Sequence, residues 1–419
     1  MRRFLCVALL LGGCTARAPR PEFVLRIAVV GPLAPLAHDT QRTATTFAQD
    51  LVYEPVLRPE GVTLGSRLLS RFERTPEGLR AHVASGRHFS DGSPVLSADV
   101  ARSIRAAGLE VREEGEALLV LAPSDGSPLD ARLSLATVFR PSPGGDLGTG
   151  PYRLVSESEE ELVVERVARA PRRIDRVEFV EAASVREAFA RALKGEANAV
   201  VNLEERHAEL AEGVPGLRLV RGRGPHAPAI ILNTRRLGPA LRRQIAEALP
   251  VAEIEEVAQG RSCEPPSGGT LTKPLPPGGM LSLAVTTLDG PIERAGLAVR
   301  RGLGPRGGPL VRVSAEEAWE RRDSYDLILN NALVWPPAIS ALYWKTGAPW
   351  NWTGYSNAAY DEALAAGDYA RADAELAKDP PVLLLCRSER IAAVDSRIRN
   401  PTLGSWGLLD TLPEWEVAP

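Results

Sequence analysis

A short polar and aromatic run in the C-terminal half is the part of this sequence best suited to hold a small ligand. It follows an apolar stretch at 325–329 and reads Asn-Asn-Ala-Leu-Val-Trp over 330–335. The indole of Trp335 favours an apolar, aromatic or sugar-like ligand face. The predicted ligand contacts are Asn233, which ends an earlier apolar run, and Asn330, Asn331, Ala332 and Trp335. The competing interpretations are that the indole fills core volume and that the asparagines satisfy main-chain groups.

Residues suited to catalysis are present, but not at catalytic spacings. The sequence has no Cys-x-x-Cys and no Gly-x-Ser-x-Gly motif, and its histidines lack the i, i+4 spacing of a helical metal pair. These histidines are His38, His82, His88, His207 and His226. Residues 302–307 fit the Gly-x-Gly-x-x-Gly pattern, but they follow a predicted helix and contain proline, so we interpret them as a loop. The sequence predicts no catalytic residue, no metal and no cofactor, and therefore a protein that is not an enzyme.

The N-terminus has the composition of an export signal. Arg2 and Arg3 precede an apolar run at 4–11, which is too short to span a bilayer, and Cys14 follows two glycines. This arrangement resembles the lipobox of bacterial lipoproteins, in which the new N-terminal cysteine is acylated. The alternative is an ordinary secretory signal. The prediction is a lipoprotein signal peptide at 1–13, lipidation at Cys14 and a tether at 14–21.

Length and charge narrow the class of protein further. The 419 residues exceed what a single hydrophobic core usually spans, so two or three lobes are expected. The 50 basic and 53 acidic residues are scattered along the chain, which excludes the electrostatic footprint of a nucleic-acid-binding protein. After removal of the signal and lipidation of Cys14, Cys263 and Cys386 remain, either as one disulfide or as two free thiols.

The second half of the chain alternates strand and helix patterns. After an N-terminal half rich in strand-like runs, we expect a strand, helix, strand, helix and strand at 283–286, 292–303, 310–313, 315–321 and 325–329. This alternation indicates a parallel sheet with crossover helices. In the first half, Ser97 is the expected N-cap of a helix over 98–107.

Short motifs of turn and capping residues are spread over nearly the whole chain. They are Leu-Val-Tyr-Glu-Pro at 51–55, His-Phe-Ser-Asp-Gly-Ser-Pro at 88–94 with Ser-Ala-Asp-Val at 97–100, Gly-Thr-Gly-Pro-Tyr at 148–152, Gly-Glu-Ala-Asn at 195–198, and Gly-Tyr-Ser-Asn and Tyr-Asp at 354–357 and 360–361. In this order they resemble the extracytoplasmic solute-binding proteins of ABC importers, in the large family that binds peptides and nickel. Turn and capping chemistry assigns the motif residues to the scaffold.

The resemblance implies an α/β fold of the type II periplasmic-binding-protein, or Venus-flytrap, kind. The implied divisions are lobe I at 22–56, 148–234 and 392–419, a reduced β-rich accessory subdomain at 57–147, and lobe II at 235–391. Such a protein captures a small molecule or peptide by closing two lobes and delivers it to an ABC permease. It would act as a monomer, lipid-anchored on the periplasmic side of a membrane.

Departures from the family bear on the ligand. Peptide-binding members carry an aspartate after the strand that ends near residue 329, where it pairs with the α-ammonium of the peptide. Residues 330–337 contain no carboxylate, and a buried ammonium without its counter-ion binds poorly. Members are also usually longer, and this chain is short at 107–148 and at 279–314. The alternative is therefore a degenerate relative with a sensory or structural role in the cell envelope.

Overall fold

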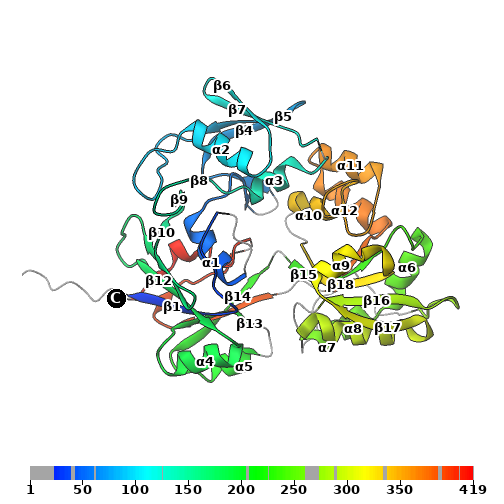
Figure 1. Ribbon diagram of the computed structural model, residues 1–419. Helices are drawn as coiled ribbons and strands as arrows, with labels where there is room; N and C mark the ends of the chain where they lie inside the picture. Colours follow the sequence, from blue (N-terminus) through cyan, green and yellow to red (C-terminus); the bar gives the residue numbers. More distant parts are fainter. Residues whose placement is uncertain are drawn as a thin grey trace, which may run out of the picture.

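Three bodies, each built on its own sheet, surround a common centre in the computed structural model of the chain (Figure 1). The structure describes residues 23–38, 43–60, 63–124, 126–203, 207–224, 226–259, 273–286, 290–333, 337–385, 389–404 and 406–418. The predicted signal peptide, Cys14, the tether at 14–21, Cys263, Cys386 and Trp335 lie outside these residues. Within them, no helix combines the length and the apolar character that crossing a bilayer requires.

The first body is a seven-stranded sheet covered by helices on both faces. Its strand order is β10 (Tyr152–Glu157), β11 (Glu161–Arg166), β12 (Arg176–Ala182), β1 (Val24–Val30), β13 (Ala199–Leu203), β20 (Glu389–Asp395) and β14 (Leu217–Arg223). Because successive strand residues point to opposite faces, Ile27 and Val29 pack with α1 (Thr43–Val52), whereas Ala28 packs with α4 (Val185–Leu193) and α5 (Ala208–Glu212).

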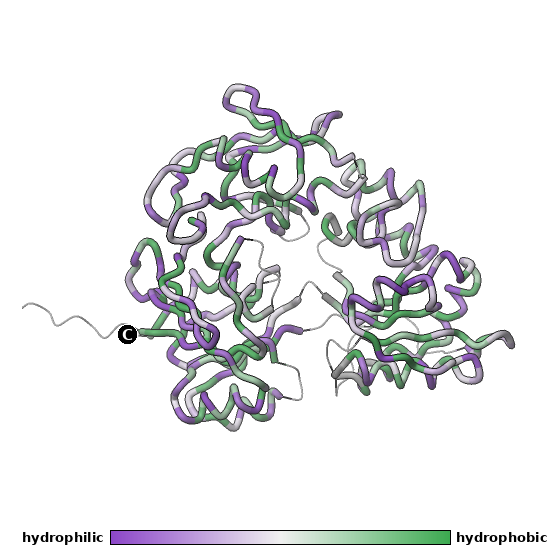
Figure 2. The backbone as a smooth tube through the Cα atoms, viewed as in Figure 1, coloured by the Kyte–Doolittle hydropathy of each residue, from purple (hydrophilic) through white to green (hydrophobic). Residues whose placement is uncertain are grey.

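The second body confirms the predicted parallel sheet with crossover helices. Its strand order is β17 (Gly307–Val313), β16 (Leu281–Thr286), β18 (Leu327–Leu333), β15 (His226–Leu232) and β19 (Val382–Leu384), and β16 runs parallel to both β17 and β18. Figure 2 shows the hydrophobic stretches along these strands. The helices of this body are α6 (Pro239–Ala248), α7 (Val251–Gln259), α8 (Gly290–Gly302), α9 (Ala315–Glu320), α10 (Pro337–Trp344), α11 (Ala358–Ala365) and α12 (Tyr369–Lys378), with the short 3-10 turns η2 (Gly304–Arg306) and η3 (Arg322–Ser324).

The third body is the accessory subdomain. Its four-stranded antiparallel sheet has the order β4 (Leu69–Thr75), β5 (Gly78–Val83), β7 (Ala117–Leu121) and β6 (Val111–Glu114), with α2 (Ser97–Ala106) and α3 (Leu129–Leu135) beside it. The N-cap of α2 is Leu96, not Ser97 as predicted, because the Asp99 carboxylate accepts a hydrogen bond from Leu96 N at 3.0 Å. Small pairs complete the strands: β2 (Arg58–Glu60) with β3 (Thr63–Gly65), β8 (Phe139–Arg140) with β9 (Leu147–Gly148), and β21 (Ile398–Arg399) with β22 (Glu416–Val417), which follows η4 (Leu412–Glu414).

Two strand crossings join the first and second bodies. The chain passes from the first sheet to the second between β14 and β15, and it returns between β19 and β20. β15 already pairs with the second sheet from residue 226, whereas the expected division between the lobes was at residue 234. On the way back, β20 pairs with the first sheet from residue 389, whereas the expected division was at residue 392. The sequence pattern could not locate these points, because an apolar strand looks alike whichever sheet it joins.

Three of the motifs named in the sequence analysis pack against one another. Gly150 N donates to Val52 O at 2.9 Å, and Ser90 N donates to Gly148 O at 2.9 Å. A Cβ on Gly148 would overlap the Val52 carbonyl oxygen, so only glycine permits this close approach. The motifs thus fix α1 to the entrance of β10, as expected of scaffold residues.

Candidate functional site

The predicted ligand-contact run lies where β18 approaches the first strand crossing. In the antiparallel β15–β18 pair, Leu333 faces His226, the first residue of β15. Asn330 is buried, and its Oδ1 accepts hydrogen bonds from Thr286 Oγ1 at 3.0 Å and from Asn331 N at 2.9 Å. Asn331 is partly exposed, whereas Ala332 is fully buried in the core of the second body. Trp335, on which the predicted ligand chemistry mainly rests, lies outside the described residues.

Asn233 lies at the opposite end of β15 from the crossing. Its side chain is buried, and its Nδ2 donates to the main-chain carbonyls of Arg322 at 3.1 Å and Tyr325 at 2.9 Å. Its Oδ1 accepts from Arg235 N at 3.1 Å. These bonds tie the end of β15 to the turn that precedes β18, which is the structural role considered for this residue.

The C-terminal tryptophans form no common surface. Trp344 is buried in the core of the second body, and Trp352 packs edge-on against Trp319 with ring centroids 5.3 Å apart. Trp350 is 40% exposed and meets Tyr343 at 5.8 Å between centroids. Packing within the second body therefore accounts for most of the surface of these three side chains.

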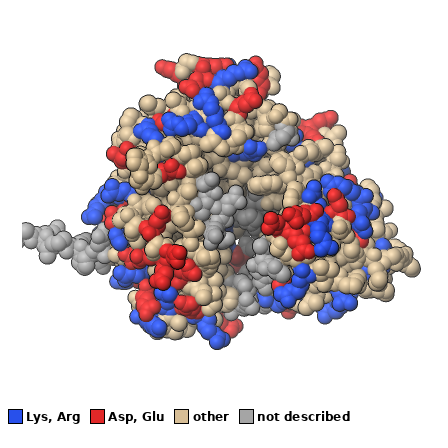
Figure 3. Space-filling model, viewed as in Figure 1, with Lys and Arg blue, Asp and Glu red and all other residues tan. Residues whose placement is uncertain are grey.

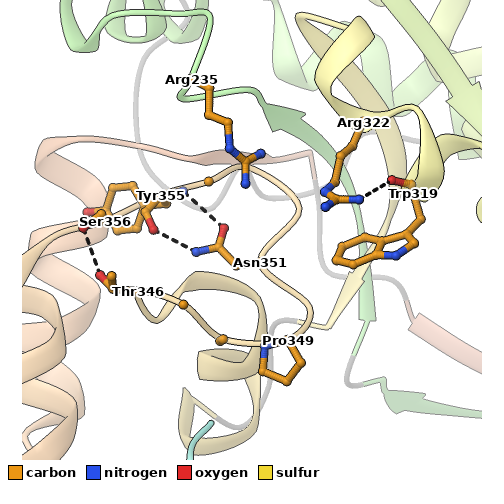
Figure 4. Close-up of a pocket in the computed structure, with 11 residues that line it drawn as sticks. Arg235, Trp319, Arg322, Thr346, Pro349, Asn351, Tyr355 and Ser356 are labelled. Carbon is orange, nitrogen blue, oxygen red and sulfur yellow. Dashed lines mark hydrogen bonds between the residues drawn. The ribbon is translucent and has the colours of Figure 1, made fainter. Parts of the chain in front are cut away.

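A cavity of about 330 Å³ opens at the end of the second sheet that lies away from the strand crossings. Arg235, just beyond β15, and Arg322, just before β18, reach it from one side together with Trp319 of α9. The loop at 346–356, between α10 and α11, forms the other side, and Figure 4 shows both guanidinium groups directed toward the space between. No sequence pattern singled out this set of residues.

The loop at 346–356 is held rigid by its own polar groups. Asn351 Nδ2 donates to Lys345 O at 3.1 Å and to Tyr355 O at 2.8 Å, while its Oδ1 accepts from Tyr355 N at 3.2 Å and from Thr353 Oγ1 at 3.0 Å. Asp361 accepts from Thr346 N at 3.1 Å. The Gly-Tyr-Ser-Asn motif takes part as well, since its asparagine caps α11. The wall of the cavity is therefore preformed.

Ion pairs connect the arginines beyond β15 to the turn before β18. Arg235 Nη1 lies 2.8 Å from Asp323 Oδ1 at the surface. Arg236 Nε lies 2.7 Å from Asp326 Oδ1. Burial opposes ionisation of Asp326, but the Arg236 guanidinium and hydrogen bonds from Ser282 together hold its pKa below the usual range. Asp326 therefore remains a fixed anion that anchors this end of the sheet.

A second group of charges lies on the first body, near the return crossing. Asp50 of α1, Asp410 and Arg390 of β20 interact electrostatically, and Arg390 Nη1 donates to Gly404 O at 3.1 Å. Burial, reinforced by the Asp410 carboxylate, raises the pKa of Asp50 to about 7, although Arg390 opposes the shift. Burial also raises the pKa of Asp410 and lowers that of Arg390. These three side chains are poorly solvated, and within this group Asp50 titrates near neutrality.

All three bodies meet at one apolar contact. Ala131 of α3 packs with Ile339 and Leu342 of α10, and Tyr343 and Trp406 pack against this cluster. Trp406 belongs to the C-terminal segment of the first body, so each body contributes to the contact. Figure 3 shows a hollow between the bodies, with acidic and basic side chains intermixed on the visible face.

Polar contacts reinforce the junction between the accessory subdomain and the second body. The Lys345 ammonium donates to Gly126 O, and Asp130 of α3 interacts with Tyr369 of α12 and with Arg74. Burial raises the pKa of Asp130 even though Arg74 opposes the shift. Movement of the second body relative to the accessory subdomain must break these contacts.

Within the described residues, no three histidine, cysteine, aspartate or glutamate side chains gather in a way that would hold a metal ion. No protein-family model and no curated protein sequence matches the chain.

Comparison with solved structures identifies the fold. The chain is similar to the oligopeptide-binding protein AppA of Bacillus subtilis in complex with a nonapeptide, with a TM-score of 0.69, 14% identity, and coverage of 96% of this chain and 100% of the other. A nickel ABC transporter protein of Bacillus halodurans gives a TM-score of 0.74 at 13% identity, covering 94% and 100%. The binding protein AgaA of A. tumefaciens R10, in complex with agropinic acid, gives 0.72 at 15%, covering 95% and 99%. The expected two-lobed fold of the peptide- and nickel-binding solute-binding proteins is confirmed.

Proposed function

We propose that this chain is an extracytoplasmic solute-binding protein that captures a small organic solute or peptide between its lobes and presents it to an ABC permease. The main support is the architecture. Two sheets with separate cores are joined by two strand crossings, in a fold shared over 94 to 96% of the chain with binding proteins. Such a hinge lets ligand binding energy shift the balance between open and closed forms.

The ligand site in this proposal is the hollow beside the carboxyl end of β18. In open parallel sheets, ligands bind outside the carboxyl ends of the strands. The parallel strands β16 and β18 both point their carboxyl ends toward the crossing. In this proposal Asn331 and Trp335 contact the solute, whereas the buried Asn330 and Ala332 belong to the supporting core.

The chemistry of the run argues against the usual recognition of a free peptide. The similar structures bind a nonapeptide in one case and agropinic acid in another. Residues 330–337 of this chain offer no carboxylate to an α-ammonium group. An organic solute that places an apolar or aromatic face against Trp335 fits these residues better.

The remaining parts of the proposal concern location. Export and acylation at Cys14 would tether the monomer through residues 14–21 to the outer side of a membrane, next to its permease. Palmitate labelling of cells that produce the wild type, but not the Cys14→Ser variant, is the expected result. Equal labelling of both would contradict the anchor.

Native mass spectrometry of protein purified from its own cells tests the function directly. A solute that co-purifies, and that compacts the protein in small-angle scattering when added back, is expected. Trp335→Ala should weaken its binding by at least tenfold, whereas Trp350→Ala, a tryptophan outside the proposed site, should not. Absence of both a bound mass and any compaction across a broad solute library would favour a degenerate envelope lipoprotein instead.

A further inference from the structure

We propose that the cavity between Arg235, Arg322 and the loop at 346–356 is a second ligand site, which binds a small organic carboxylate. It is separate from the interlobe site, because both arginines lie at the ends of β15 and β18 that point away from the crossing. Seven residues of β15 at about 3.4 Å each place it roughly 20 Å from that crossing. Binding there does not require the lobes to close.

Protein contacts hold both arginines in position and leave some N–H donors of each guanidinium group for a ligand. The Arg322 guanidinium carbon lies 4.2 Å from the centroid of the Trp319 ring, and its Nη1 donates to Trp319 O at 2.8 Å. The Arg235 guanidinium lies across Gly354, since a Cβ on that glycine would approach its Cζ to 2.5 Å. A guanidinium carries five N–H donors in a fork that matches a carboxylate, and these contacts use only part of each fork.

Polar side chains of the cavity wall bond to their own loop, and the charged groups of the described lining are the two arginines. The side-chain amide of Asn351 donates and accepts hydrogen bonds within the cavity wall. Among the described residues, no acidic residue lines the cavity. Thr346 Oγ1 donates to Ser356 Oγ at 3.2 Å, so the Ser356 proton points elsewhere. The cavity therefore brings two guanidinium groups together with no carboxylate in its described lining, because Asp323, the acid that pairs with Arg235, lies outside that lining. Such an arrangement suits an anion.

The competing protein anion is weakly held. Asp323, which pairs with Arg235, has a side chain that is 65% exposed, and ion pairs between exposed side chains are weak. A ligand carboxylate can displace it at little cost. The cavity of about 330 Å³ is at the small end of the ligand-pocket range, roughly 300 to 1,000 Å³. It suits a molecule of about the size of an amino acid or a dicarboxylate.

Titration calorimetry of the full chain tests this site with acetate, succinate and citrate, and with inorganic phosphate at the same ionic strength. Saturable 1:1 binding of at least one carboxylate is expected, tighter than that of phosphate. Arg235→Gln and Arg322→Gln should each weaken it at least tenfold, and Asp323→Asn should strengthen it severalfold by releasing Arg235. Arg321→Gln is the matched control, because Arg321 pairs with Glu317 and lies outside the cavity.

Several results would overturn the site. They are the absence of saturable carboxylate binding by the wild type, phosphate binding as tight as that of the best carboxylate, and unchanged binding in both arginine variants that keep the wild-type circular dichroism. Small-angle scattering separates this inference from the interlobe proposal. Carboxylate at this cavity should leave the radius of gyration unchanged, and it should bind even if no solute is found that compacts the protein.

Discussion

Replacing Asp50 by asparagine should make the protein more stable at alkaline pH and leave its stability at pH 4 nearly unchanged. The pKa of Asp50 rises from the ordinary 3.8 to about 7, chiefly because burial and the Asp410 carboxylate disfavour its charge. Between these two values the native state holds a proton that the unfolded state has lost. The free energy of unfolding therefore falls as pH rises through this interval and levels off above it.

The size of the effect follows from the shift. One pKa unit corresponds to about 1.4 kcal/mol, so a shift of roughly three units sets an upper limit of about 4 kcal/mol. Asp50 keeps some contact with solvent, and the amide of the variant gives up the attraction between the carboxylate and Arg390. We therefore expect a gain of about 2 kcal/mol at pH 8.

Urea unfolding of wild type and Asp50→Asn at pH 4, 6 and 8, followed by tryptophan fluorescence, measures this difference. Asp91→Asn is the control. The Asp91 carboxyl is exposed, and hydrogen bonds from Ser93 lower its pKa, so it stays ionised in both states above pH 6. Its variant should differ from wild type by the same amount at pH 6 and pH 8. Stability profiles of wild type and Asp50→Asn that run parallel from pH 4 to 8 would refute the argument.

Three further substitutions probe the scaffold through thermal and urea unfolding. Gly148→Ala should cost at least about 2 kcal/mol, because the new Cβ overlaps the Val52 carbonyl oxygen, whereas Gly144→Ala, where a Cβ meets no atom within 4 Å, should cost far less. Asn233→Ala should cost about 2 kcal/mol, because one buried and one partly buried carbonyl lose their donor; a cost near zero would mean that water replaces the amide. Tyr152→Phe removes a 2.7 Å hydrogen bond to Ile174 O and the acceptor of Arg166 Nη2, and it should cost about 1 kcal/mol; an unchanged stability would mean that the bond from Arg166 Nε to Ile174 O suffices.

The sequence predicts the α/β order of the second body well because its signals are local. Apolar runs separated by capping residues gave the strands and helices from β16 to β18 nearly in place. Burial on each strand was harder to predict. Asn330 and Ala332 have the residue types of ligand contacts, yet the pairing of β18 with β15 and β16 encloses both.

The cavity could not be predicted, because a long-range register creates it. Leu232 pairs with Leu327, and this pairing places the residues after β15 beside those before β18. Arg235 and Arg322 thereby become neighbours although 87 positions separate them in the sequence. The loop at 346–356 reaches the same place through a hydrogen bond from Thr234 N to Thr353 O at 3.0 Å. None of these relations leaves a periodic trace in the sequence.

The motif residues that carry the resemblance hold the scaffold together through packing and hydrogen bonds. They therefore account for the fold and say little about the ligand. The glycines at 148 and 150 fit against α1, Asn357 caps a helix, and Asn198 pairs through its amide with Arg26 N at 2.7 Å and Val24 O at 2.9 Å. Groups used in this way are not available to a solute. Under the proposed function, specificity comes from positions at which this chain departs from the motifs. Substitutions at Trp335 should then change the choice of solute, whereas those at Gly148 should change only stability.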